Sequence, residues 1–278
     1  MTRPMTTGFI GLGQMGAPMA GRISDLIVYD TSPDALEPFK DKAAGSVAEV
    51  ARAADVVSVM VRDDDQVNAV GAEVLASARP GTVLAIHSTI RARTAEDLAT
   101  RARPYGIEVV DAPVSGGFMG ASAGTLAVMV GGSDEAFARC KESFGSWADL
   151  ILHMGPVGAG TRTKLARNLL HFVAFTAAAE AQRLAEASGV SLRKLGRVVR
   201  HSDAITGGAG SIMLRSTTAP LAKDDELYGI LRHVRALGEK DLSLALELAD
   251  ELNVDTPLAR LALERFAAGL GLPDEEEA

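Results

Sequence analysis

Residues 8–16 read Gly-Phe-Ile-Gly-Leu-Gly-Gln-Met-Gly, and this stretch decides the fold. Its glycines have the G-x-G-x-x-G spacing and lie between a short apolar run and a helical pattern. In that context Gly11 allows a tight turn, Gly13 lets the backbone approach a pyrophosphate, and Gly16 lets strand and helix pack closely. A plain strand-to-helix turn is the alternative explanation. The context favours a nucleotide-binding loop.

A carboxylate supports the nucleotide interpretation. Asp30 closes the next apolar run, 19 residues after Gly11. In dinucleotide-binding sheets, a carboxylate at this place accepts hydrogen bonds from the adenosine ribose hydroxyls. Neither Thr31 nor Ser32 is an arginine that could pair with a 2′-phosphate. The sequence therefore favours NAD over NADP as cofactor.

The rest of the chain divides into an α/β part and a helical part. Up to about residue 153, β-rich runs alternate with helical patterns, which predicts a parallel or mixed sheet with helices on both faces. These runs cover residues 9–10, 26–29, 56–61, 82–86, 107–110 and 126–130. Beyond residue 158, only helices are expected, over residues 163–187, 192–201, 227–253 and 257–268. The Gly-rich stretch 155–160 suggests two domains, 1–157 and 158–278.

Composition narrows the class of partner. The net charge of −8 argues against nucleic acid or an anionic membrane surface, so a small molecule is the expected partner. The single cysteine, Cys140, cannot form an internal disulfide, and no Cys/His cluster has metal-ligand spacing. We expect no metal, and Cys140 is expected to be inert packing. A single cysteine is typical of a protein of the reducing cytoplasm, and the N-terminus does not read as a signal peptide.

Two further stretches carry candidate chemistry. Residues 111–117, Asp-Ala-Pro-Val-Ser-Gly-Gly, follow a predicted strand. The Ser115 hydroxyl and exposed backbone N–H groups there could form a pocket for a carboxylate, although an ordinary turn explains them equally well. Lys164 and Asn168, four residues apart, lie on one face of the next predicted helix. This pair could act on a substrate hydroxyl, but a lysine here is commonly a solvated surface charge.

Four ordered stretches together resemble the signature motifs of the β-hydroxyacid dehydrogenases, a family that includes 3-hydroxyisobutyrate dehydrogenase and tartronate semialdehyde reductase. They are residues 8–20, residues 111–117 with 124–126, residues 158–168, and residues 240–242. The match spans nearly the whole chain in the right order. It implies a Rossmann-type N-terminal domain and an all-α C-terminal domain, joined by a long helix. It also implies a homodimer or homotetramer that assembles through the helical domain.

The resemblance assigns roles to individual residues. Lys164 would be the catalytic acid/base and Asn168 its substrate-orienting partner. The substrate carboxylate would bind at Ser115, Gly116 and Gly117. The cofactor would be bound by Gly11, Leu12, Gly13, Gln14, Met15, Gly16, Asp30, Val61, Thr89 and Lys240. The implied reaction is NAD-dependent oxidation of a short 3-hydroxy acid to its semialdehyde, or the reverse reduction.

The chain departs from the family pattern at several places. The helix after the glycine loop is expected to end about four residues early. Ile86 and Ala92 stand where the family usually has an acidic residue and a proline, so the loop between them is expected to differ in shape. Arg167 replaces the first of two asparagines, and this cation could favour a more anionic substrate. His171, on the same helical face as Lys164, reads as either a packing residue or a substrate contact.

Other functions remain open from the sequence. One is an NADPH-dependent reductase of semialdehydes or imines on the same fold, against which Asp30 and Lys164 both argue. Another is a non-catalytic NAD-binding module. Lys240 also has a second explanation, as a helix-surface partner of Asp241 or Glu239.

Overall fold

The computed structural model describes residues 5–272. The first four residues and the acidic tail, residues 274–277, lie outside the described residues. The chain forms two compact units, Met1–Asn168 and Leu169–Ala278, and the division falls within one long helix, α8 (Ala159–Ala187). Each unit has its own core and is described separately.

The first unit is built on an eight-stranded sheet with the order β2-β1-β3-β4-β5-β7-β6, and β8 pairs with β7. The strands are β1 (Thr7–Ile10), β2 (Leu26–Tyr29), β3 (Val56–Val59), β4 (Val83–Ile86), β5 (Glu108–Asp111), β6 (Val114–Ser115), β7 (Leu126–Gly131) and β8 (Ala148–Gly155). Strands β1 to β5 are parallel, whereas β7 runs antiparallel to β5 and β6. The six predicted runs all form strands; β6 and β8 were not predicted.

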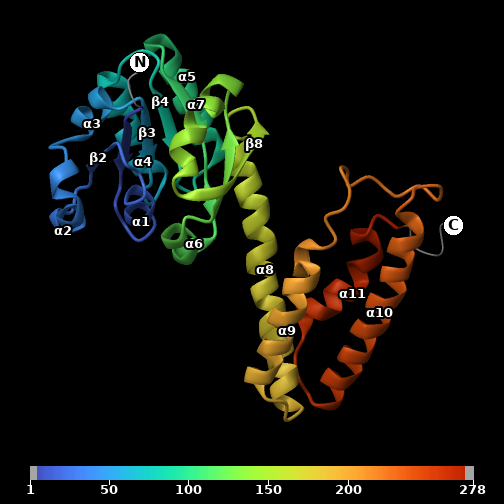
Figure 1. The fold of residues 1–278 in the computed structure, drawn as a ribbon. Helices are drawn as coiled ribbons and strands as arrows, with labels where there is room; N and C mark the ends of the chain where they lie inside the picture. The colour runs from blue at the N-terminus through green and yellow to red at the C-terminus, as the bar shows by residue number, and fades with distance from the viewer. Residues whose placement is uncertain (1–4, 273–278) are drawn as a thin grey trace. The chain divides into compact units, whose positions relative to one another are not determined.

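Helices cover both faces of this sheet (Figure 1). Successive strand residues point to opposite faces, so that Phe9 belongs to one core and Ile10 to the other. One core packs under α1 (Gly16–Ala20), α6 (Gly117–Ala123) and α7 (Asp134–Gly145). The other packs under α3 (Val47–Ala53), α4 (Asp64–Ser77) and α5 (Ala92–Ala102). A short helix, α2 (Pro33–Leu36), and two 3₁₀ turns, Glu37–Lys42 and Arg103–Tyr105, complete the unit.

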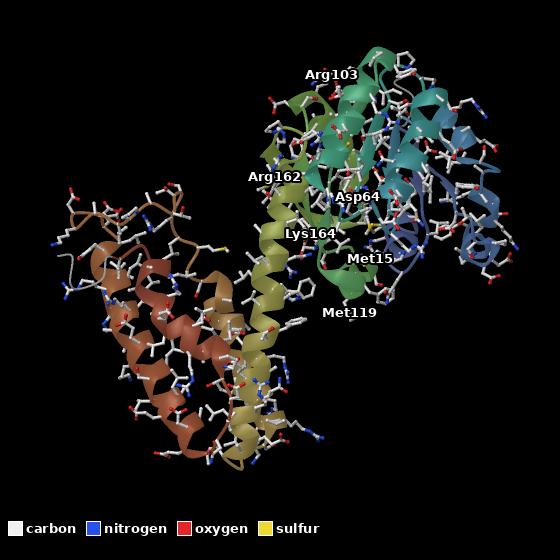
Figure 2. All side chains as sticks on the ribbon, turned by 180° about the vertical axis from the view of Figure 1, so that it is seen from behind. Met15, Asp64, Arg103, Met119, Arg162 and Lys164 are labelled. Atoms are coloured by element: carbon white, nitrogen blue, oxygen red, sulfur yellow. The ribbon has the colours of Figure 1, made fainter. Side chains whose placement is uncertain are left out.

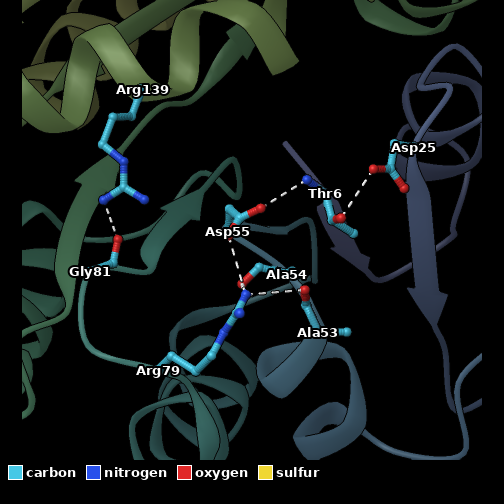
Figure 3. A network of polar contacts seen from close by, with 8 residues as sticks. All are labelled: Thr6, Asp25, Ala53, Ala54, Asp55, Arg79, Gly81 and Arg139. Carbon is cyan, nitrogen blue, oxygen red and sulfur yellow. Dashed lines mark hydrogen bonds and ion pairs between the residues drawn. The ribbon is translucent and has the colours of Figure 1, made fainter. Parts of the chain in front are cut away.

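A polar network ties together the amino ends of the central strands (Figure 3). The carboxylate of Asp55 accepts a hydrogen bond from the Thr6 backbone N–H at 2.9 Å and lies 3.2 Å from the Arg79 guanidinium. Arg79 also donates to the carbonyl groups of Ala53 and Ala54. The site described below forms at the opposite, carboxyl edge of the sheet.

The second unit is helical, as predicted. Besides the C-terminal part of α8, it contains α9 (Leu192–Thr206), a 3₁₀ turn (Gly208–Gly210), α10 (Tyr228–Glu251) and α11 (Pro257–Gly269). Buried Glu180 fixes the start of α11, because its two carboxylate oxygens accept the backbone N–H groups of Leu258 and Ala259 at 2.9 Å each. Helix α9 continues past the predicted His201 and ends where Gly207 adopts a φ of +86°.

One prediction about a single residue can be compared directly with the structure. Cys140 is fully buried, and burial raises the pKa of its thiol to about 12, so it is an unreactive packing residue. Within residues 5–272, no helix has the length and apolar character needed to cross a bilayer.

Candidate active site

A cleft of about 860 Å³ lies at the carboxyl ends of the parallel strands. It belongs entirely to the first unit, because every lining residue precedes Leu169. The residues predicted from sequence that line it are Gly11, Gly13, Gln14, Met15, Gly16, Asp30, Val61, Thr89, Gly117 and Lys164. The volume suits a molecule of nucleotide size.

The glycine loop leaves room for a ligand at only one of its three glycines. A Cβ atom on Gly11 would collide with the Met60 carbonyl, and one on Gly16 would collide with the Gly11 carbonyl. A Cβ atom on Gly13 would meet nothing within 4 Å. Gly11, which has a φ of +93°, and Gly16 are therefore required by close packing, whereas Gly13 opens the backbone toward the cleft.

Asp30 is held in place by the loop beside it. Its carboxylate accepts the backbone N–H of Leu12 at 2.6 Å and that of Ser32 at 2.8 Å. Leu12 itself is buried and does not line the cleft, so its contribution is the backbone contact with Asp30. Each carboxylate oxygen retains a lone pair, so Asp30 can still accept hydroxyl donors from a ligand.

The loops after β3 and β4 are tied to each other. The Ser88 hydroxyl accepts the Val61 N–H at 2.9 Å and donates to the Val61 carbonyl at 2.7 Å. Farther along, Asp64 accepts the backbone N–H of Arg91 at 3.0 Å. This carboxylate fixes the chain just before α5, at the segment where the sequence lacks the family's usual proline.

Lys164 lies in the first part of α8 and reaches the cleft (Figure 2). Its ammonium group donates a hydrogen bond to the Val114 carbonyl at 2.6 Å. Partial burial lowers the pKa of Lys164, and the positive charge of Arg167 lowers it further. The hydrogen bond thus fixes the side chain in the cleft, and the lowered pKa reduces the cost of losing its proton.

Asp111 connects the strand end to the start of α8. This fully buried carboxylate accepts the backbone N–H of Gly158 at 2.7 Å and that of Thr161 at 2.6 Å. Burial raises the pKa of Asp111, and the two backbone donors oppose that rise. Their bonds explain why α8 begins at Ala159, four residues before the predicted start at Thr163. Asp111 begins the 111–117 motif, but the sequence alone does not reveal this role, because its partners lie 47 and 50 residues away.

A second buried group holds the same loop from β4. The Nδ1 atom of His87 donates to the Ala112 carbonyl at 2.8 Å, because a carbonyl can only accept. Complete burial lowers the pKa of His87 to about 4, so the ring is neutral near pH 7. Its Nε2 atom therefore accepts the Ser58 hydroxyl at 3.0 Å. The 111–117 loop is thus anchored by His87, by Asp111 and, through Val114, by Lys164.

Of the predicted carboxylate pocket, Ser115 to Gly117, only one residue belongs to the cleft wall. Gly116 and Gly117 have φ values of +132° and +63°, which explains the two successive glycines. Gly117 lines the cleft, whereas Ser115 and Gly116 are not among its lining residues. Within residues 5–272, no protein group accepts a hydrogen bond from the backbone N–H of Gly116 or Gly117. These donors are available to an anion.

Asn168 follows Lys164 by one helical turn and does not line the cleft. Its side-chain oxygen accepts a hydrogen bond from the Arg167 guanidinium at 3.3 Å. The side-chain NH₂ group of Asn168 therefore remains as its available donor. Arg167, where the family usually has an amide, thus contacts Asn168 and acts electrostatically on Lys164.

The remaining predicted residues lie in the second unit. Lys240 is on α10, where its ammonium group pairs with Asp241 at 2.8 Å. His171 packs against Phe172 and Phe175, with ring centroids 5.3 and 4.4 Å away. A cofactor role for Lys240 stays a prediction.

Several cleft residues were not identified from sequence. They include Arg62, Gln66, Ala69, Val70, Glu73, His87 and Val114. Gln66, Ala69, Val70 and Glu73 recur along α4 with helical spacing. In the sequence, this spacing is equally consistent with an ordinary solvent-exposed helix face. Across residues 5–272, no cluster of three His, Cys, Asp or Glu side chains could hold a metal ion.

Two family models match the chain, one on each side of residues 156–157. Residues 6–155 match the model for the NAD-binding domain of 6-phosphogluconate dehydrogenase. Residues 158–276 match the model described as NAD-binding of NADP-dependent 3-hydroxyisobutyrate dehydrogenase. The chain belongs to the β-hydroxyacid dehydrogenase family. As a member of that family, it is an NAD(P)-dependent oxidoreductase that acts on a CH–OH group.

Relatives of this β-hydroxyacid dehydrogenase match it over nearly their whole length. An uncharacterised oxidoreductase of Mycobacterium tuberculosis is 57% identical, over 96% of this chain and 93% of the relative. The NAD-dependent L-serine dehydrogenase of Pseudomonas aeruginosa is 35% identical, over 93% of this chain and 90% of the relative.

Solved structures show the same fold. A putative oxidoreductase from Mycobacterium avium superposes with a TM-score of 0.94 at 51% identity, over 98% of this chain and 100% of the other. The 3-hydroxyisobutyrate dehydrogenase of Mycobacterium tuberculosis, solved with L-serine, gives 0.67 at 31% identity, over 98% and 97%. An imine reductase from Myxococcus stipitatus, at 20% identity, a TM-score of 0.76 and coverage of 98% and 97%, shares the fold alone.

Proposed function

We propose that this β-hydroxyacid dehydrogenase uses NAD to oxidise a short 3-hydroxy acid to its semialdehyde, or catalyses the reverse reduction. Lys164 is the general acid/base. The observation that carries the proposal is the Lys164 ammonium in the cleft, 2.6 Å from the carbonyl of Val114, which lies two residues before the 116–117 turn. The hydrogen bond to Val114 thus connects the proposed proton acceptor on α8 to the loop that carries the proposed carboxylate-binding turn.

The proton follows a simple route in the oxidation direction. Neutral Lys164 donates one N–H to Val114, which directs its lone pair away from that carbonyl and toward a substrate hydroxyl. As the alcohol carbon becomes a carbonyl carbon, the hydroxyl proton moves to the Lys164 amine. The bound nicotinamide ring supplies the hydride acceptor. In the reverse direction, the Lys164 ammonium returns the proton to the carbonyl oxygen.

The substrate carboxylate is assigned to Ser115, Gly116 and Gly117. The two glycine N–H groups have no acceptor among the described residues, and consecutive N–H groups in such turns favour anions. Asn168 would orient the substrate through its NH₂ group. The relative from Pseudomonas aeruginosa is named an NAD-dependent L-serine dehydrogenase, and the related 3-hydroxyisobutyrate dehydrogenase from Mycobacterium tuberculosis was solved with L-serine. L-serine is itself a 3-hydroxy acid. L-serine and its short homologues are therefore the first substrates to test.

NAD is the proposed cofactor. The residues fit a pyridine nucleotide: Gly13 leaves open space where a pyrophosphate would lie, and Asp30 offers lone pairs to ribose hydroxyls. A 2′-phosphate would bring a second anion close to the Asp30 carboxylate, which is electrostatically unfavourable. Cytoplasmic location is part of the same proposal.

The central test replaces the lysine. Lys164→Ala should reduce kcat about 10²- to 10⁴-fold while leaving the dissociation constant for NAD unchanged, because only the proton acceptor is lost. The assay compares 3-hydroxyisobutyrate, 3-hydroxypropionate, glycerate, L-serine and 4-hydroxybutyrate with NAD and with NADP. Thr163→Ala, one residue earlier on α8, is the matched control and should retain turnover. Near-normal turnover in Lys164→Ala would disprove its role.

A further inference from the structure

Arg62 has an unused guanidinium group beside the cleft. The residue lies three positions after the end of β3, is exposed, and lines the cleft. Its backbone N–H donates to the Gln66 side chain at 3.1 Å, which fixes the main chain at this point. Throughout the part of the chain that the structure describes, its guanidinium makes no hydrogen bond or ion pair. A fixed backbone thus presents a free cationic plane.

Helix α4 provides a complementary wall. Gln66, Ala69, Val70 and Glu73 all line the cleft, and their spacing of three, four and seven residues puts them on one helical face. The middle of this face is apolar and its ends are polar. Such a wall suits a flat heterocycle with polar edges better than it suits a phosphate.

Strand order places this wall relative to Asp30. Strands β2 and β3 flank β1, so the chain ends after them are separated by two strand spacings, or about 10 Å. Asp30 follows β2 and Arg62 follows β3, on opposite sides of the glycine loop. A ribose bound to Asp30 would therefore have its base within reach of the long Arg62 side chain.

We propose that Arg62 binds the adenine ring of the cofactor by laying its guanidinium plane against one face of the base, beside the Ala69–Val70 face of α4. Arginine is suited to this contact because its planar, weakly hydrated cation stacks on aromatic faces. The neighbouring Asp30 carboxylate disfavours the other use of an arginine here, pairing with a 2′-phosphate. The inference deepens the cofactor part of the proposed function and is independent of the hydroxy acid substrate.

Calorimetric titration with cofactor fragments tests the contact. We expect Arg62→Ala to weaken ADP-ribose binding about 3- to 30-fold, as loss of a cation–π contact does. The affinity for 2′-phospho-ADP-ribose should fall by the same factor. The affinity for nicotinamide mononucleotide, which has no adenine, should not change. Arg62→Lys keeps the charge but loses the plane, so its affinity for ADP-ribose should fall between those of wild type and Arg62→Ala.

Matched controls separate the outcomes. Arg93→Ala removes an exposed arginine that pairs with Asp97 outside the cleft, and it should change none of the three affinities. Unchanged ADP-ribose binding in Arg62→Ala overturns the proposal. If only the affinity for 2′-phospho-ADP-ribose falls, Arg62 pairs with a phosphate and the proposal is overturned. If the affinity for nicotinamide mononucleotide falls equally, the substitution has disturbed the loop, and the proposal is overturned as well. Because no hydroxy acid is used, a failed substrate assignment would not alter these results.

Discussion

Arg167 is the residue at which this chain departs most clearly from its family near the proposed catalytic group. It lies three positions after Lys164 on α8, touches Asn168 through its guanidinium, and lowers the pKa of Lys164. A neutral amide at the same position would retain the polar contact without the electrostatic effect. The charge of Arg167 should therefore be visible in the pH dependence of the reaction.

Arg167→Gln should move the pH–rate profile in a defined direction. Removing the nearby positive charge raises the pKa of Lys164, so a higher pH is needed to obtain the neutral amine that accepts the hydroxyl proton. The rising limb of kcat for oxidation should then shift to higher pH, as steady-state assays across pH would show. Arg167→Lys should leave it in place.

Arg162→Gln is a second control on the same helix. Arg162 pairs with Glu96 at 2.6 Å and does not contribute to the lowered pKa of Lys164. Arg162→Gln should leave the rising limb of the pH–rate profile at the same pH as in the wild type. If Arg167→Gln also leaves it unmoved, the charge of Arg167 has no part in setting the protonation of the catalytic group.

At the scale of elements, two helices begin on the same kind of support. Asp111 binds two backbone N–H groups at the start of α8, and Glu180 binds two at the start of α11. Both carboxylates are buried. Only Asp111 supports the helical turn that leads to Lys164. Comparing substitutions of Asp111 and Glu180 therefore separates an effect on stability from an effect on catalysis.

Asp111→Asn and Glu180→Gln should each lower the free energy of unfolding by about 1–3 kcal/mol, because each amide leaves one buried N–H without an acceptor. Thermal or urea denaturation measures this loss. Asp111→Asn should in addition reduce kcat, by up to about 10²-fold, through displacement of Lys164. Equal kcat values in the two variants would show that Asp111 has a structural role only.

The sequence predicted well those features that depend on neighbouring residues. The G-x-G-x-x-G turn and the short α1 follow from local spacing, and the six strand runs follow from apolar patterning. Arg62 was missed because its place depends on the strand order β2-β1-β3, which no local pattern displays. The early start of α8 was missed for a similar reason, since Asp111 acts across 47 residues to Gly158.

At the scale of the whole molecule, the second unit exposes many large apolar side chains. On α8 and α9 they include Leu169, Phe172, Phe175, Val198 and Ile205. Its only described buried cluster away from the sheet is small, built on Leu221, Leu231, Leu270 and Leu272. Exposed apolar surface of this kind is characteristic of subunit interfaces. It supports the proposed assembly of two or four copies through the helical unit.

Light scattering coupled to size exclusion should therefore give a mass of two or four chains. Val198→Glu, which places a charge at a side chain that is 63% exposed, should shift the population toward single chains. Tyr105→Glu changes an exposed apolar residue of the first unit and serves as the control. A wild-type protein that remains a single chain at micromolar concentration would contradict the assembly.

The support that Asp111 gives to α8 also determines where this fold tolerates changes in length. A helix turns by about 100° per residue, so the number of residues between Thr161 and Lys164 determines the direction in which the Lys164 side chain points. Thr161 is the reference point because Asp111 binds its backbone N–H. One residue inserted between Thr161 and Lys164 would swing the amine out of phase with the cleft. One inserted among residues 155–157, before the held N–H of Gly158, would be absorbed in the loop. The phase of the active site is therefore set by a strand end, and it is insensitive to the length of the linker before the helix.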